Sequence, residues 1–352
     1  MLDLAVPWLV IVFLVGAAAT WAAGIRLSRT TDALDVRFNL GEALGGVVLL
    51  AFAGTLPEFA ITVSAAAQGD LSLAAGNLIG GIAVQTMVLV ICDFAVQGKQ
   101  PLTFLVGALT PVLEAWLVVL VVSVVLMGSL LPPSAAIGGV VSPASVAIVL
   151  FWLAGVAVLN YVRKNPRWSV SMPGSRRGRA SRRNDHPEAP HPYAGDSTTR
   201  VLAYFAGACA ITLVAGVALE LSGEALANRA GINGVVFGAT VLATATALPE
   251  ISSGLAAVKL GDNALAIGDI FGGNAFQVCL FLVADLVAGS PVLPTAGRLN
   301  GWLASLGVAL TAVYGIGLIV RPERVVARLG PDSICAVVVF AAGIVGLALL
   351  PK

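Results

Sequence analysis

Residues 46–93 of this 352-residue chain recur without a gap 192 positions further along, at residues 238–285. Eighteen of the 48 paired positions are identical. Matches between Ala or Gly carry little weight in a chain rich in both, but Leu-Pro-Glu, Gly-Asp, Gln and Asp also recur in register. The chain therefore consists of two related halves.

Both halves are built from long apolar runs. Only 11% of the residues are charged and 58% are hydrophobic, whereas soluble domains carry about 25% charged residues. Runs of about 20 apolar residues predict membrane-spanning helices. We therefore expect an all-α membrane protein with ten transmembrane helices, at 6–27, 40–67, 71–96, 102–127, 143–162, 200–220, 232–258, 263–288, 299–320 and 333–350. The first run lacks a basic flank and is expected to be a retained helix rather than a signal peptide.

Five spans per half is an odd number, so the second half enters the membrane from the opposite side. The expected organisation is a first five-helix repeat at 1–162, a cytoplasmic basic loop at 163–199 and a second, inverted five-helix repeat at 200–352. Inverted repeats are typical of secondary transporters, whose ion sites lie near the midplane where the halves meet.

The charged residues orient the chain. The 163–200 segment is rich in Arg, Ser and Pro, and placing it in the cytoplasm puts all but three of the 20 Lys and Arg residues inside. The exceptions are Arg229, Arg298 and Lys352. By the positive-inside rule, this predicts a multi-pass protein of the cell membrane with both termini extracytoplasmic.

The Leu-Pro-Glu segments place a proline and a glutamate inside apolar spans. Pro57 and Pro249 disrupt the helix and release the carbonyls of Ala53 and Ala245, four residues earlier. In lipid, such a carbonyl is tolerated only where it faces protein, water or an ion. The adjacent glutamates are costly in the membrane and are expected to face the interior.

The next span of each half supplies further oxygens. Glu58 and Glu250 are followed by Asn77 and Asp269, which occupy equivalent positions among glycines. Thr55 and Thr246 lie within one turn of the glutamates. These oxygen ligands suit Ca²⁺, Na⁺ or protons rather than a soft metal.

These motifs resemble the cation/calcium exchanger superfamily, most closely its prokaryotic sodium/calcium exchanger branch. The family pattern reads G-T-S-L-P-E, then G-N/D-x-x-G-S-N-x-x-N. The resemblance implies that Glu58, Glu250, Asn77 and Asp269 coordinate the transported cation.

The chain departs from this pattern at several hydroxyl positions. Ser is missing at Gly81, Gly273 and Ala247, and Thr is missing at Gly54. In the family such groups help to hold sodium, so their loss favours protons as the coupling ion.

The predicted function is an antiporter that exchanges Ca²⁺ or a similar cation for H⁺ or Na⁺ by alternating access. A Na⁺/H⁺ antiporter and a passive cation channel remain open as alternatives. Enzymatic activity is not expected, because an intramembrane aspartyl protease needs two aspartates and the partner of Asp269 is Asn77. We expect no cofactor and no nucleic-acid partner; the partners are inorganic cations and the lipid bilayer.

Other acidic residues receive separate interpretations. Asp93 and Asp285 match across the halves near helix ends and are expected to be interfacial or gate-packing residues. Glu114, whose counterpart is Leu306, is a candidate proton-handling or auxiliary residue. Glu42 is expected to be a solvated helix-end residue. The four widely spaced cysteines suggest neither a disulfide nor a zinc site.

Overall fold

A computed structural model describes residues 4–38, 54–96, 100–165, 193, 195–232 and 237–350. The described chain is helical, as a row of apolar segments in lipid requires. Its α-helices are α1 (Val6–Phe38), α3 (Leu56–Gln68), α4 (Leu71–Ala95), α5 (Leu102–Leu105), α6 (Thr110–Ser129), α7 (Pro143–Lys164), α8 (Thr198–Ala230), α10 (Ala243–Thr246), α11 (Leu248–Leu260), α12 (Asn263–Gln277), α13 (Leu280–Ala288), α14 (Gly297–Val320) and α15 (Pro331–Leu349).

Seven stretches of the described chain are long and apolar enough to cross a membrane, and eight if the bent pair α10–α11 is one span. Two predicted spans fall short of this measure for identifiable reasons. Residues 40–53 of the second span, with Glu42 and Ala53, lie outside the described residues. The stretch of α15 that enters this measure is Pro331–Leu347, which is shorter than the length required of a span.

Several expected helices differ in length or continuity from their predicted bounds. The first and sixth spans extend to Phe38 and Ala230, well beyond the apolar runs from which they were predicted. The fourth is divided into α5 and α6, and the eighth into α12 and α13. Apolar runs show which residues lie in lipid, but polar helix extensions and internal breaks leave no apolar signal.

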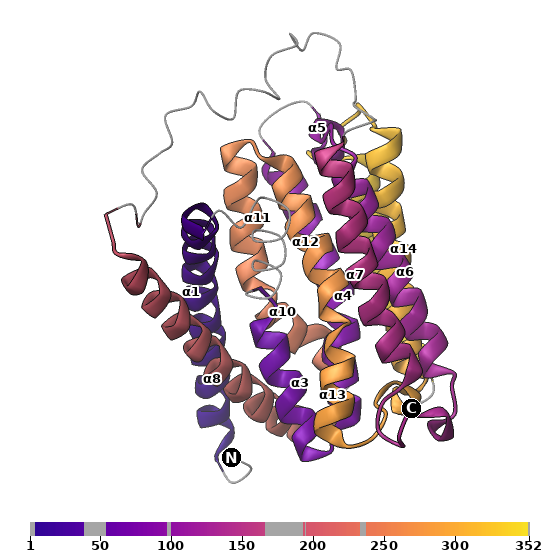
Figure 1. Cartoon of the computed structure of the whole chain (residues 1–352). Helices are drawn as coiled ribbons and strands as arrows, with labels where there is room; N and C mark the ends of the chain where they lie inside the picture. The colour runs from indigo at the N-terminus through magenta and orange to yellow at the C-terminus, as the bar shows by residue number, and fades with distance from the viewer. Residues whose placement is uncertain are drawn as a thin grey trace.

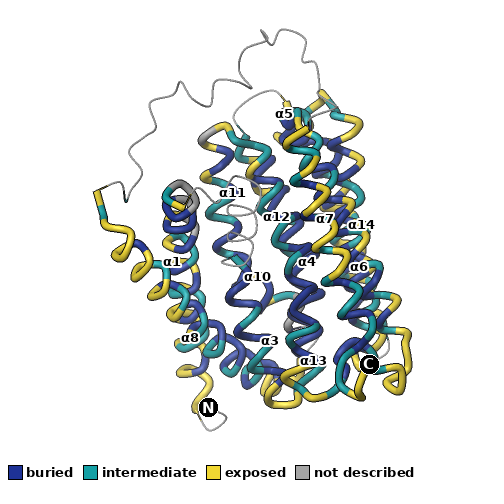
Figure 2. The backbone as a smooth tube through the Cα atoms, viewed as in Figure 1, coloured by how far each residue is buried: buried dark blue, intermediate teal, exposed yellow. Residues whose placement is uncertain are grey.

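Burial divides the helices into inner and outer ones. In the most apolar stretch of α4, 67% of the residues are buried, whereas in that of α7 only 17% are. Exposed residues follow the outer helices, as along α7 and α8 in Figure 2. They include large apolar ones, such as Leu14 of α1, Leu150 of α7 and Val214 of α8. An outer surface of this kind is suited to lipid tails.

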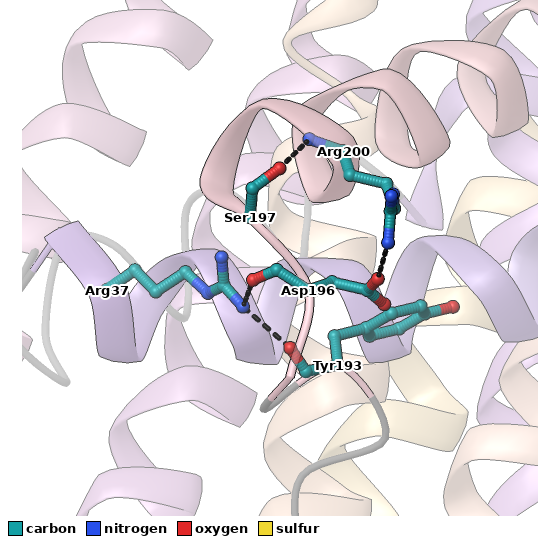
Figure 3. Close-up of polar contacts among 5 residues, drawn as sticks. All are labelled: Arg37, Tyr193, Asp196, Ser197 and Arg200. Carbon is teal, nitrogen blue, oxygen red and sulfur yellow. Dashed lines mark hydrogen bonds and ion pairs between the residues drawn. The ribbon is translucent and has the colours of Figure 1, made fainter.

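Helices α1 and α8 pack along each other at one side of the bundle (Figure 1). Arg37, near the end of α1, donates hydrogen bonds to the carbonyls of Tyr193 at 2.6 Å and Asp196 at 2.8 Å (Figure 3). Asp196 also pairs with Arg200 at 2.8 Å, and Ser197 caps α8 by accepting from the Arg200 amide. The end of α1 is thereby fastened to the beginning of α8.

Candidate functional site

The two Leu-Pro-Glu segments each lie at the start of a helix. Pro57 is in the first turn of α3, and Pro249 is in the first turn of α11. In the second copy α10 ends at Thr246, and the chain bends by 48° before continuing as α11. The predicted break is therefore present there, whereas residues 39–53, ahead of the first copy, lie outside the described chain.

The two glutamates converge on one side chain, Gln85 of α4. Its Nε2 lies 3.2 Å from Glu58 Oε1 and 3.4 Å from Glu250 Oε1, so one amide group donates to both carboxylates. Glu58 is fully buried and Glu250 is 8% exposed. In both, Oε2 has no hydrogen-bond partner among the described residues. Two buried carboxylate oxygens are thus available to a ligand.

Asp269 approaches the same site from α12. Its Oδ2 accepts a hydrogen bond of 2.6 Å from Ser253 Oγ of α11, and its charge acts on Glu250. Asn77 is fully buried on α4, about two turns before Gln85, and neither atom of its amide has a hydrogen-bond partner among the described residues. The structure therefore brings Glu58 and Glu250 together at Gln85, places Asp269 on the same cavity as Glu250, and leaves the Asn77 amide without a partner among the described residues.

The two threonines flank this arrangement. Thr246 is buried, contacts Glu58 and donates to the carbonyl of Ala243 at 3.1 Å. Thr55 is also buried, and its own carbonyl accepts the first hydrogen bond of α3, from the Phe59 amide. Both hydroxyls are close to the glutamate-bearing turns, as their sequence positions imply.

A cavity reaches Glu250 and Asp269 from the side of α1 and α8. Thr20 of α1 and Thr212 of α8 line it, and each has a buried hydroxyl without a partner among the described residues. Neither threonine was predicted as a site residue. A signal was present, because they are 192 residues apart and so extend the repeat register beyond the segment first aligned.

The three glycines that stand where the family has a hydroxyl differ in the space around them. At Gly81 the space that a side chain would fill holds the amide of Gln277, which donates to the carbonyl of Leu78 at 2.7 Å. At Gly54 a Cβ would lie 3.9 Å from Glu250 Oε1, so a hydroxyl there would border the site. Gly273 faces open space. The two glutamines therefore differ: Gln85 binds the carboxylates, and Gln277 fills a gap between helices.

The paired aspartates bind backbone rather than the site. Asp93 accepts from the amides of Leu102 and Gly330, each at 2.7 Å, and from the Ser333 hydroxyl. Asp285 accepts from the amides of Val292 at 2.7 Å and Ser142 at 2.9 Å. Each aspartate thus ties a loop of its own half to the start of the last helix of the other half. This geometry agrees with an interfacial role.

Another buried glutamate, Glu220 of α8, was not predicted. It accepts from Ser64 Oγ at 2.9 Å and from Gln68 Nε2 at 3.2 Å, both on α3. It lay at the last residue of a predicted span, where a charge is unremarkable. Only the extension of α8 to Ala230 shows that Glu220 lies well within the helix.

The site offers hard oxygen ligands without forming a closed cage. Among the described residues no three His, Cys, Asp or Glu side chains converge as a ready metal site. A cation would need water, backbone oxygens or a movement of Asp269 to complete its coordination. Buried carboxylates on broken helices, in an all-helical membrane protein, are features of secondary transporters. The fold and site define a membrane transporter of cations.

Comparison with known proteins identifies the family. The family model for sodium/calcium exchanger protein matches residues 8–165 and 200–349. The chain therefore belongs to the sodium/calcium exchanger family, which is a family of transporters and not of enzymes. Inner membrane protein YrbG of Escherichia coli (strain K12) is 26% identical to it over 277 residues, which are 78% of this chain and 76% of YrbG.

Solved structures share the fold. The H⁺/Ca²⁺ exchanger CAX superposes with a TM-score of 0.70 at 15% identity, over 98% of this chain and 82% of CAX. The sodium-calcium exchanger NCX_Mj superposes with a TM-score of 0.59 at 16% identity, over 99% of this chain and all of NCX_Mj. The two halves of the family match flank the basic segment, as expected for a repeat.

Proposed function

We propose that this transporter is a secondary active antiporter, exchanging Ca²⁺ or a similar cation for H⁺ or Na⁺ by alternating access. The observation that carries the proposal is the convergence of Glu58 and Glu250 on Gln85. The two carboxylates come from equivalent turns of the two halves, and each keeps one oxygen without a partner among the described residues. A divalent cation offsets two buried negative charges that would otherwise be costly to bring together.

Ten spans in two inverted five-helix repeats are part of this proposal. The equivalent roles of Asp93 and Asp285 in the two halves support it. So do the chain ends, which lie at one end of the bundle in Figure 1, as an even number of spans requires. We place both termini outside the cell membrane and the 163–199 loop in the cytoplasm.

For the coupling ion we favour the proton. A sodium site needs about five or six oxygens, and the chain lacks hydroxyls at Gly54, Gly81 and Gly273. The space at Gly81 is already filled by Gln277. A proton needs only a carboxylate whose burial favours the neutral form. Both kinds of driving ion are represented among the structural neighbours, in CAX and NCX_Mj.

The experiment is ⁴⁵Ca²⁺ flux in proteoliposomes. With a protonophore present and equal pH on both sides, an inward Na⁺ gradient should fail to drive Ca²⁺ efflux. An imposed pH gradient, with the membrane potential clamped, should drive it. Na⁺-driven efflux would show that sodium, and not the proton, is the coupling ion. Ca²⁺ flux that needs no opposing gradient would indicate a channel, and Na⁺/H⁺ exchange without Ca²⁺ flux would indicate the Na⁺/H⁺ antiporter.

The site itself is tested by Glu58→Gln and Glu250→Gln. Each change removes one charge that offsets the dehydration of the cation, while the similar shape of Gln preserves packing. We expect Ca²⁺ exchange to be abolished in both variants, with an unchanged elution profile in size-exclusion chromatography. Wild-type flux in both purified variants would contradict the site assignment.

A further inference from the structure

Glu114 is the only charged residue of α6, and the transport site does not use it. It is 4% exposed, and its Oε2 has no hydrogen-bond partner among the described residues. A buried carboxylate that lacks donors is strongly penalised as an anion unless a cation or proton accompanies it. Glu114 therefore requires a nearby positive charge or a bound proton.

The side chains around Glu114 show that a proton fits this position better than a metal ion. The carboxyl group borders a cavity between α6, α7 and α12. Apart from Gly272 and Glu114 itself, the described residues that line the cavity have apolar side chains, namely Leu117, Trp152, Val156, Leu159, Phe271 and Ala275. A metal ion needs several oxygen ligands and finds one carboxyl group here. The cavity chemistry is suited to a proton.

Glu114 also lies directly behind the transport site. A Cβ added to Gly268 of α12 would lie 3.0 Å from Glu114 Oε2, so the carboxyl group packs on the α12 backbone at the residue before Asp269. The Asp269 side chain is held by Ser253 of α11. Glu114 therefore packs on α12 at the residue next to Asp269.

Two charged groups act on Glu114 from the packed helices. They are Arg163, in the last turn of α7, and Asp269 of α12, which carry opposite charges. Helix α14 also packs on α6, and its only charged residue is Arg298 in its first turn. A cation bound beside Asp269 would cancel the repulsion and leave the attraction of Arg163. Binding of the cation would thereby favour loss of a proton from Glu114.

The comparison of the two halves also relates Glu114 to Asp269. The contact between α6 of the first half and α12 of the second corresponds, by the repeat, to the contact between α14 of the second half and α4 of the first. There the equivalents of Glu114 and Asp269 are Leu306 and Asn77, both uncharged. Glu114 and Asp269 are thus both acidic where the repeat partner is uncharged, and they lie on two helices that contact each other.

We propose that Glu114 is a proton-binding site distinct from the cation site, loaded when that site is empty and discharged when a cation binds beside Asp269. The O–H bond of the Glu114 carboxylic acid breaks, the electron pair stays on the carboxylate, and the proton passes to water. No redox partner is involved. This inference rests on the proposed cation exchange and identifies a group that carries the coupled proton.

The test is proton release during Ca²⁺ binding, measured with a pH indicator in weakly buffered solution of detergent-solubilised protein. We expect Glu114→Gln to bind Ca²⁺ in calorimetry yet to release about one proton fewer per Ca²⁺ than wild type. Glu220→Gln is the matched control, because Glu220 is an equally buried glutamate whose donors are Ser64 and Gln68. It should release the wild-type number. If Glu114→Gln does not fold, Glu114→Leu, which copies the other half, takes its place.

Equal proton release by wild type and the Glu114 variants, with Ca²⁺ binding intact, would overturn the proposal. Infrared spectroscopy separates this result from failure of the proposed function. The spectrum of the Ca²⁺-free wild type should contain a carbonyl band of a protonated carboxylic acid that is lost in Glu114→Gln, beside any band from Glu58 and Glu250. Should wild type bind no Ca²⁺, that band would still support a proton at Glu114, and its absence from wild type would refute one.

Discussion

Asp269 is the residue at which the two halves of the site differ in charge. Its counterpart is Asn77, so Asp269→Asn makes the halves match and lowers the maximal charge of the site from three carboxylates to two. The Ser253 hydroxyl can still donate to the remaining oxygen. We therefore expect intact folding and Ca²⁺ affinity at least about tenfold weaker, or about 1.4 kcal/mol, measured by calorimetry.

Asn77→Ala is the comparison for that variant. It removes an uncharged oxygen and should weaken binding without altering the charge balance of exchange. If Asp269→Asn binds Ca²⁺ as tightly as wild type over a wide pH range, Asp269 is not a ligand.

Gly54 and Gly273 are positions where a hydroxyl can be added without displacing a neighbour. A Cβ at Gly54 comes no nearer than 3.9 Å to Glu250 Oε1, and one at Gly273 meets nothing within 4 Å. The double variant Gly54→Ser and Gly273→Ser restores two potential sodium ligands. We expect Na⁺ to compete with ⁴⁵Ca²⁺ uptake more strongly in this variant, by about an order of magnitude in the inhibitory concentration.

Gly81→Ser provides the contrast, because its new side chain would collide with the Gln277 amide. That variant should lose thermal stability rather than acquire sodium sensitivity. Unchanged competition by Na⁺ in the double variant would show that the missing hydroxyls do not determine ion choice.

At the scale of helices, α1 and α8 each approach the broken helix of the opposite half through a glycine. A Cβ on Gly24 of α1 would lie 2.5 Å from Pro249 Cβ. A Cβ on Gly216 of α8 would lie 2.8 Å from Ala60 Cβ and 3.1 Å from the Pro57 carbonyl oxygen. The two glycines are 192 residues apart, so the close contact is duplicated with the repeat.

Gly24→Ala and Gly216→Ala should therefore push α1 and α8 away from the glutamate-bearing turns. Overpacking of this kind costs about 1–3 kcal/mol, and we expect lower exchange rates and a lower melting temperature for both variants. Gly207→Ala is the control on α8, since Gly207 is exposed and nothing lies within 4 Å of its added Cβ. If Gly24→Ala exchanges ions and melts like wild type, the helices can separate at this contact without a measurable cost.

At the scale of the whole molecule, the distribution of basic residues predicts an orientation. Both ends should be extracytoplasmic and the 163–199 loop cytoplasmic. A reporter active only in the cytoplasm should report when inserted near residue 180 and remain silent when fused after Lys352. The reverse pattern would show that the chain has the opposite orientation in the membrane.

Much of this arrangement could be predicted from sequence, because lipid imposes simple rules. Charged residues in apolar runs are rare, so Glu58 and Glu250 were evident from the sequence, and the repeat register related them to each other. What could not be predicted depends on helix orientation. Nothing local shows that Gln85 faces the glutamates while its counterpart Gln277 fills the gap at Gly81. Thr20 and Thr212 reach the site only because α1 and α8 pack against it.

The aspartate ties between the halves have a consequence for how the chain is made. Asp285 holds the amide of Ser142, and Asp93 holds that of Gly330, across 143 and 237 residues of sequence. When the first half leaves the ribosome and enters the membrane, the start of α7 still lacks its acceptor. The carboxylate of Asp93 likewise lacks the Gly330 amide until the start of α15 has been made. The first half therefore enters the bilayer with these hydrogen bonds unformed, and its packing is completed only when the second half has inserted beside it.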